Sequence, residues 1–124
     1  MVPFAWNPCV LEGDLGRLTS IQLSFIGDGE YDMPRVGPEL DNATCTMDEI
    51  ENRGAADLAV LMEDADEEVN KVTGIGIFFS DEYFFYHGNY TLNRLDIKIE
   101  SNQHIVGFWG SATETAITQL GLIL

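Results

Sequence analysis

Histidine and cysteine, the side chains that most often carry chemistry near neutral pH, occur only twice each in this chain. His87 and His104 have no cysteine or second histidine at metal-ligand spacing, and both flank turn residues, which favours solvated loop histidines. Cys9 and Cys45 are too few for a disulfide scaffold. Two alternatives stay open: one bridge tying the N-terminal segment to the acidic middle, or two buried thiols in a reducing compartment. We expect no metal and no cofactor.

Paired carboxylates, which could hydrolyse a glycoside, can be picked out wherever a chain is this acidic. Glu12 with Asp14, and Asp81 with Glu82, lack the apolar setting that would raise the pKa of one partner. The acidic run Asp64–Glu68 lacks the glycine and the terminal glutamate of a calcium-binding EF-hand loop. The sequence therefore predicts a protein that is not an enzyme.

The charge is strongly negative and unevenly distributed. Twenty-one acidic and six basic residues give a formal net charge of −15, and most of it lies between residues 28 and 68. This balance argues against nucleic acid and against anionic membrane surfaces as partners. It serves solubility through self-repulsion, or provides an acidic face for a basic partner or weak divalent-cation binding.

Length and hydropathy bound the domain organisation and the location. The chain has 124 residues, 45% of them hydrophobic, which suits one domain with one core. No apolar run is long enough to cross a bilayer, so we expect no membrane insertion. The first six residues lack the basic start and apolar run of a secretory signal. The protein is then cytoplasmic if the chain is complete, or secreted if a leader was removed.

Short apolar runs separated by turn residues predict an all-β fold. In one run, Leu95, Ile97 and Ile99 alternate with polar residues and should face inward; Ile21, Leu23 and Phe25 should do so in another. Polar neighbours such as Thr19, Gln22 and Ser24 should face outward. The expected strands are Leu18–Ile26, Ala55–Met62, Val69–Phe79, Tyr83–Tyr86, Arg94–Glu100, Ile105–Gly110 and Ala116–Leu124.

The remaining segments are expected to be irregular. Residues 1–16 are interrupted by prolines and glycines, and residues 41–54 form a polar loop with one helical turn around Met47–Asn52. Turns are expected at Gly27–Gly29, Ser80–Glu82, His87–Asn89 and Asn102–Gln103.

Aromatic side chains offer candidate stacking surfaces for a sugar. Tyr83–Tyr86 could form such a platform, but alternation along a strand more simply divides these four side chains between two faces. Trp109 and Trp6 are better candidates for an exposed aromatic ring, although either could belong to the core.

The C-terminal half resembles the jacalin-related lectins. The residues that carry the resemblance are VTGIGIFF at 72–79, YHG at 86–88, IVGFWGS at 105–111 and QLGLIL at 119–124, with a looser match at Trp6 and at 16–23. The resemblance implies a single β-prism domain over residues 1–124, built from three four-stranded antiparallel Greek-key sheets. It also implies non-covalent sugar binding.

Members of that family hold sugars with a glycine-rich N-terminal loop and a Gly-x-x-x-Asp loop before the last strand. Registered from Gly121, the second loop falls on residues 114–118, with Glu114 at the glycine position and Thr118 at the aspartate position. No Gly-Gly pair precedes Trp6. The resemblance therefore implies an altered carbohydrate site, for which the expected residues are Trp109, Glu114, Thr115, Ala116 and Thr118, assisted by His87 and Asn89.

Two functions follow from these observations. The first is a lectin-like carbohydrate-binding module whose partner is a glycan. The alternative is a non-enzymatic interaction or assembly subunit that uses the prism as a scaffold and presents residues 28–68 to a basic protein partner. A homo-oligomer is compatible with either.

Overall fold

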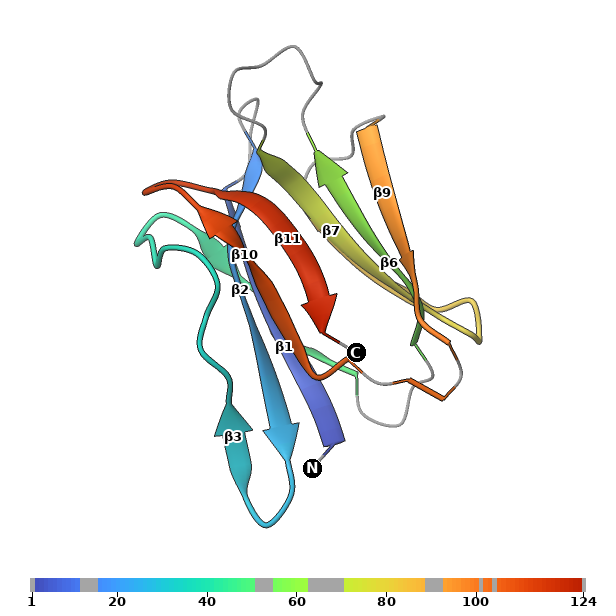
Figure 1. Ribbon diagram of the computed structural model, residues 1–124. Helices are drawn as coiled ribbons and strands as arrows, with labels where there is room; N and C mark the ends of the chain where they lie inside the picture. Colours follow the sequence, from blue (N-terminus) through green and yellow to red (C-terminus); the bar gives the residue numbers. More distant parts are fainter. Residues whose placement is uncertain are drawn as a thin grey trace.

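The structure, a computed structural model, describes residues 2–11, 16–50, 55–62, 71–88, 93–100, 102–103 and 105–123 (Figure 1). All regular elements in these ranges are β-strands. They are β1 (Val2–Leu11), β2 (Arg17–Ile26), β3 (Glu30–Asp32), β4 (Thr44–Cys45), β5 (Asp48–Glu49), β6 (Ala55–Met62), β7 (Val72–Phe79), β8 (Phe84–Gly88), β9 (Asn93–Lys98), β10 (Gly107–Ala112) and β11 (Ile117–Ile123). Over the described residues, no helix has the length and apolar character needed to span a membrane.

The strands form three antiparallel sheets. The first has the order β3-β2-β1-β4, and β5 also pairs with β1; the second has the order β8-β7-β6-β9; the third is the β10–β11 hairpin. The expected all-β prism is thus confirmed, with sheets of five, four and two strands over the described residues instead of four strands each. In Figure 1 the β10–β11 hairpin lies between the other two sheets.

One hydrophobic core joins the three sheets. Ile21 and Leu23 from β2, Leu58 and Val60 from β6, and Ile117 from β11 belong to one cluster of buried side chains. These side chains are fully buried, and burying each one stabilises the fold by about 1.5–3 kcal/mol before the entropy of ordering it is counted.

β2 departs from simple alternation because it contains a bulge. Cys9 pairs with Ser20 but Val10 pairs with Leu18, so Thr19 is the extra residue and the inward face changes from odd to even positions. Leu18 and Ile21 therefore both reach the core.

The bulge and the strand beyond it also bury two hydroxyls that were expected to face outward. Thr19 Oγ1 donates to the carbonyl oxygen of Cys9 at 3.0 Å, and Ser24 Oγ donates to Asp32 Oδ1 at 2.6 Å. Thr19 was expected to face outward and is instead buried at the bulge, whereas Ser24 lies on the face opposite Leu23 and Phe25 as expected and is buried there beside Asp32.

Residues 1–16 were expected to be irregular, but residues 2–11 form β1, which pairs with β2 along its length. The prolines do not prevent this. Pro8 lies opposite Ile21, but the backbone N–H and carbonyl of Ile21 bond to Val36, at 2.9 Å each, and not to Pro8. The nitrogen of Pro8, which carries no hydrogen, therefore faces away from β2. On that side of β1, Pro8 lies between the residues that pair with β4 and those that pair with β5.

The expected loop over residues 41–54, with its helical turn, is replaced in its described part by two short edge strands. β4 pairs Cys45 with Cys9, and β5 pairs Asp48 with Trp6. Of the two alternatives for the cysteines, the structure has the bridge: Cys9 and Cys45 form a disulfide between directly opposite residues. These strands were not visible as a pattern because two residues are too few to show alternation.

Most other strand and turn predictions are confirmed, with two corrections. His87 and Gly88 belong to β8 rather than to a turn. In β9, Leu95 is 51% exposed and Ile97 is half-buried, and Ile99, just beyond the strand, is buried. Leu95 is not buried because β9 lies at the edge of its sheet among the described strands, where it pairs with β6 alone.

Gly37 provides a test of how the segment after β3 packs on β2. It has a φ of +97°, and a Cβ added there would overlap the carbonyl oxygen of Thr19. Gly37→Ala should therefore lower the free energy of unfolding by about 1–3 kcal/mol. Urea denaturation measures this change.

Gly29 is the matched control, because a Cβ there would meet nothing within 4 Å. Gly29→Ala should leave the urea midpoint nearly unchanged. Equal effects of the two substitutions would contradict the close approach at Gly37.

Candidate functional site

The loop that joins β10 to β11 is held in shape by its own hydrogen bonds. The backbone N–H of Thr113 donates to the carbonyl oxygen of Ala116 at 2.8 Å, and the N–H of Thr115 donates to Thr113 Oγ1 at 3.3 Å. Thr118 Oγ1 donates to the carbonyl oxygen of Ser111 at 3.1 Å, across the register shift between Ser111 and Ala112. The loop is a fixed turn, and Thr118 uses its hydroxyl proton inside it.

Arg17, the first residue of β2, attaches this loop to the five-stranded sheet. Its Nε donates to the carbonyl oxygen of Thr115 at 3.0 Å. The two residues are 98 positions apart in the sequence, and each lies at the end of its sheet. The loop therefore presents a guanidinium group beside its tip.

Of the expected site residues on this loop, Glu114 and Thr115 are exposed and Ala116 is buried beneath them. No described residue donates a hydrogen bond to the Glu114 carboxylate. An exposed carboxylate can accept hydrogen bonds from two hydroxyls at once, which is how a sugar is often held. Chemically, the loop can bind hydroxyl groups.

Trp109 lies on the face of the hairpin rather than at the loop. It is 55% exposed, and its ring packs on Gly121 of β11, where any added Cβ would overlap the indole. Beyond it, Ser111 Oγ donates to Gln119 Oε1 at 3.4 Å. From the rise of a strand, Trp109 stands about 13 Å from Thr113, where the loop starts. Its exposed ring is a flat apolar surface with polar groups at its edge.

His87 is placed elsewhere by the structure. Its Nε2 contacts Asp48 Oδ2 in a close pair, and Trp6 Nε1 donates to the same carboxylate oxygen at 2.9 Å. The side chains of His87 and Asp48 are largely buried, and the rings of His87 and Trp6 meet edge to face. The expectation of a solvated loop histidine was wrong, and Trp6 belongs to the core.

The structure therefore brings Trp109, Glu114, Thr115, Ala116 and Thr118 onto one hairpin and leaves His87 apart, on β8 against Asp48 and Trp6. Asn89 lies outside the described residues. Sequence reasoning missed Arg17 and Asp48, since each is defined by a partner distant in the chain. Among the described residues, no group of three or more His, Cys, Asp or Glu side chains could hold a metal ion.

Comparison with known proteins identifies the fold. No protein-family profile matches the chain, and no curated protein matches its sequence. Solved structures do match, with TM-scores of 0.75–0.78, and all are jacalin-related lectins. The resemblance inferred mainly from residues 72–124 is thus confirmed at the level of the fold and extends over nearly the whole chain.

Three of these structures illustrate the match. The lectin MPA, complexed with T-antigen disaccharide, has a TM-score of 0.77 at 10% identity, over 99% of this chain and 91% of its own. A galactose-specific lectin from Artocarpus hirsuta, with methyl-α-D-galactose, has 0.78 at 12% identity and the same coverage. Artocarpin with methyl-α-mannose has 0.77 at 13% identity, over 98% of this chain and 82% of its own.

The carboxylate of Asp48 links β5 to Trp6 of β1 and to His87 of β8, and this link can be tested by substitution. Asp48→Ala leaves Trp6 Nε1 and the His87 ring without their acceptor, so the free energy of unfolding should fall by about 1–3 kcal/mol. The neighbouring Glu49 is exposed, and Glu49→Ala should change it by less than about 0.5 kcal/mol. Chemical denaturation of both variants makes the comparison; similar losses would argue against a special role for Asp48.

Proposed function

We propose that this protein is a non-covalent carbohydrate-binding module whose altered site lies at the β10–β11 loop. The observation that carries the proposal is the exposed Glu114 carboxylate on a loop fixed in shape by Thr113 and Arg17. The match to lectins solved with bound sugars supports it, since those proteins share the whole fold.

The role of each residue in this site depends on which of its hydrogen-bonding groups are already bonded within the protein. The backbone N–H of Thr115 and the hydroxyl proton of Thr118 are taken by the loop itself. Glu114 is therefore the principal acceptor for sugar hydroxyls, and the Thr115 hydroxyl lies beside it. Arg17 holds the loop tip in place from β2. We leave His87 out of the proposed site, because its Nε2 is paired with Asp48.

Trp109 extends the site toward larger glycans. Its distance from the loop, about 13 Å along the strand, is too great for it to stack on the same ring that Glu114 binds. A neighbouring sugar unit in an oligosaccharide could lay its C–H face on the exposed indole. The proposed preference is thus for oligosaccharides over single sugars.

The affinity should be low. Two hydrogen bonds to a charged acceptor contribute about 1.5–3 kcal/mol each. The loss of translational and rotational freedom on association opposes this gain, so a dissociation constant in the millimolar range is expected for a monosaccharide.

Titration with methyl α-D-galactoside, methyl α-D-mannoside and their oligosaccharides tests this site. Glu114→Gln keeps the shape of the side chain and removes its charge, and should weaken binding about 5- to 10-fold. Trp109→Ala should weaken binding of oligosaccharides but leave monosaccharides nearly unaffected.

Glu30→Gln is the control, because it makes the same chemical change at the far end of β2, next to Ile26. It should leave affinity unchanged. The absence of binding to any of these sugars at millimolar concentration would overturn the proposal.

A second candidate function, binding of a basic protein, is favoured by one observation. Six exposed carboxylates lie between residues 28 and 49, and the one basic residue among them, Arg35, has a side chain only 14% exposed. The exposed acids are Asp28, Glu30, Asp32, Glu39, Asp41 and Glu49.

This candidate differs from sugar binding in its salt dependence. Affinity for a basic partner should fall about 10-fold or more between low and high ionic strength, because exposed charges are screened. It should be weakened by Glu30→Gln and left unchanged by Glu114→Gln, the reverse of the sugar-binding result. Binding of a polylysine probe, measured over a salt series, makes the distinction.

A further inference from the structure

We propose that Cys45 is a thiol–disulfide exchange site, at which a small thiol opens the Cys9–Cys45 bridge and releases the edge segment from Thr44 to Glu49. This proposal rests on the surroundings of the disulfide and is independent of sugar binding.

The two sulfur-bearing residues differ sharply in accessibility. Cys9 is 4% exposed, on a strand covered by Arg35, whereas Cys45 is an exposed residue of the short edge strand β4. Because Cys45 is the exposed residue of the pair, we take its sulfur as the point of attack for an incoming thiolate. Accessibility assigns Cys45 as the attacked atom and Cys9 as the leaving group.

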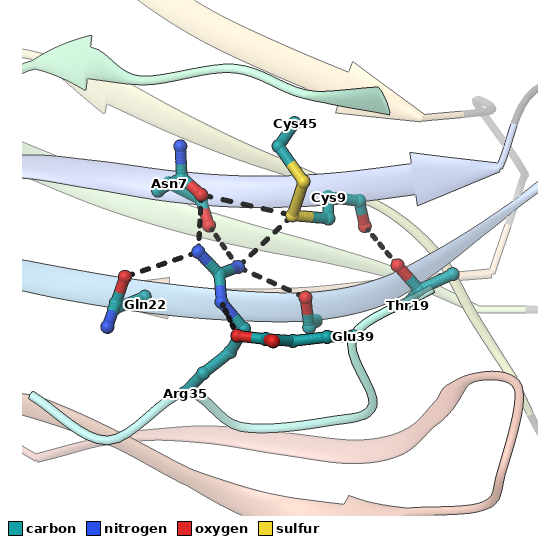
Figure 2. Close-up of a disulfide and its surroundings, with 8 residues drawn as sticks. Asn7, Cys9, Thr19, Gln22, Arg35, Glu39 and Cys45 are labelled. Atoms are coloured by element: carbon teal, nitrogen blue, oxygen red, sulfur yellow. Dashed lines mark hydrogen bonds and ion pairs between the residues drawn. A yellow bond between two sulfur atoms is a disulfide. The ribbon is translucent and has the colours of Figure 1, made fainter. Parts of the chain in front are cut away.

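The leaving group has a cation beside it. Arg35 Nη1 lies 3.1 Å from Cys9 Sγ, and Figure 2 shows it approaching this sulfur from the side opposite Cys45. A guanidinium group next to a sulfur stabilises the thiolate that forms when the bridge breaks. A more stable leaving thiolate departs faster.

The guanidinium is held in place by neutral groups, so most of its charge remains available. It donates to the carbonyl oxygen of Asn7 and to Ser20 Oγ at 3.0 and 3.1 Å, and to the side chains of Asn7 and Gln22. Its ion pair with Glu39 is long, at 3.8 Å, and the Glu39 side chain is 86% exposed. Burial lowers the pKa of Arg35, while Glu39 and Asp32 raise it; an arginine stays charged throughout.

The exchange balances without any further reactant than the thiol. A thiolate forms a bond to Cys45 Sγ as the Cys9–Cys45 bond breaks, and the electron pair of that bond goes to Cys9 Sγ. The product is a mixed disulfide at Cys45 and a thiolate at Cys9. A second thiolate then attacks the mixed disulfide, which gives the oxidised small disulfide and a free Cys45 thiolate.

Opening the bridge removes the covalent constraint on the edge segment. β4 pairs two residues with β1, and the backbone N–H of the next residue, Thr46, donates to the carbonyl oxygen of Pro8 at 3.1 Å. Asp48, three residues beyond Cys45, then keeps the two-residue pairing of β5 with β1 and its side-chain contacts with Trp6 and His87, without the covalent link next to it. Release of this segment should therefore change the surroundings of Trp6.

The site of attack can be mapped with glutathione as the probe. The oxidised protein is incubated with glutathione, quenched with acid and analysed by peptide mass spectrometry. The glutathione adduct is expected on Cys45. An adduct on Cys9, or no opening of the bridge in the folded protein, would overturn the proposal.

The role of Arg35 is tested by the rate of bridge opening. Arg35→Gln should slow it about 3- to 10-fold, because the leaving thiolate loses its cation. Arg35→Lys keeps the charge and should restore most of the rate, which separates electrostatics from a general loss of structure. Glu39→Gln, the control, should not slow opening. A faster rate in Arg35→Gln than in the parent would contradict the assignment.

The release of the edge segment has its own readout. In a Trp109→Phe background Trp6 is the sole tryptophan, since the chain has two. Its fluorescence should shift to longer wavelength as the bridge opens, with the rest of the protein still folded by circular dichroism. Opening of the bridge with no change at Trp6 would show that the segment stays in place and would refute the release.

Discussion

The antiparallel pairing of β1 with β2, from Val2 opposite Ile26 to Leu11 opposite Arg17, positions the polar contacts of Asp48, Arg35 and Arg17. Its inner face carries Trp6, which binds Asp48, and its outer face carries Cys9 and the groups that hold Arg35. Its end carries Arg17, which reaches the β10–β11 loop. β2 also packs against strands of both other sheets, so the ladder fixes the candidate sugar site and the disulfide relative to one core.

The two faces of this ladder follow different physical rules. The inner face is stabilised by removal of apolar side chains from water. The outer face buries a guanidinium, which is unfavourable unless each donor finds an acceptor. Here Asn7, Ser20 and Gln22 provide neutral acceptors from two adjacent strands. Arg35 therefore depends on the register of β1 against β2, and a slip of one residue would move these acceptors to the core side.

These physical differences explain what could be predicted from the sequence. Strands such as β6 and β7 were predicted correctly because their apolar residues face one continuous core. β1 was missed because Pro8 was read as a breaker, although its missing N–H faces a gap between two edge strands. The buried positions of Thr19 and Ser24 could not be predicted, since burial there depends on hydroxyl partners rather than on hydrophobicity.

The candidate site shows the same limit. Glu114 and Thr118 could be placed at the end of the last hairpin by counting back from Gly121, because register along a hairpin is local. Arg17 and Asp48 could not, because their partners lie 98 and 39 residues away. A contact across that distance depends on how the sheets meet, which no local pattern encodes.

The net charge narrows the glycans that such a site could accept. With 21 acidic residues against six basic ones, the molecule repels anions within roughly a Debye length, about 8 Å at physiological salt. Glu114 adds a further negative charge at the loop itself, and Arg17 is already engaged with Thr115. Sulfated or carboxylated sugars would thus meet repulsion both at long range and at the point of contact. Neutral hydroxyls are not repelled, and a carboxylate accepts hydrogen bonds from them more strongly than a neutral oxygen would. The same charge that argues against nucleic acid as a partner is therefore compatible with a neutral sugar.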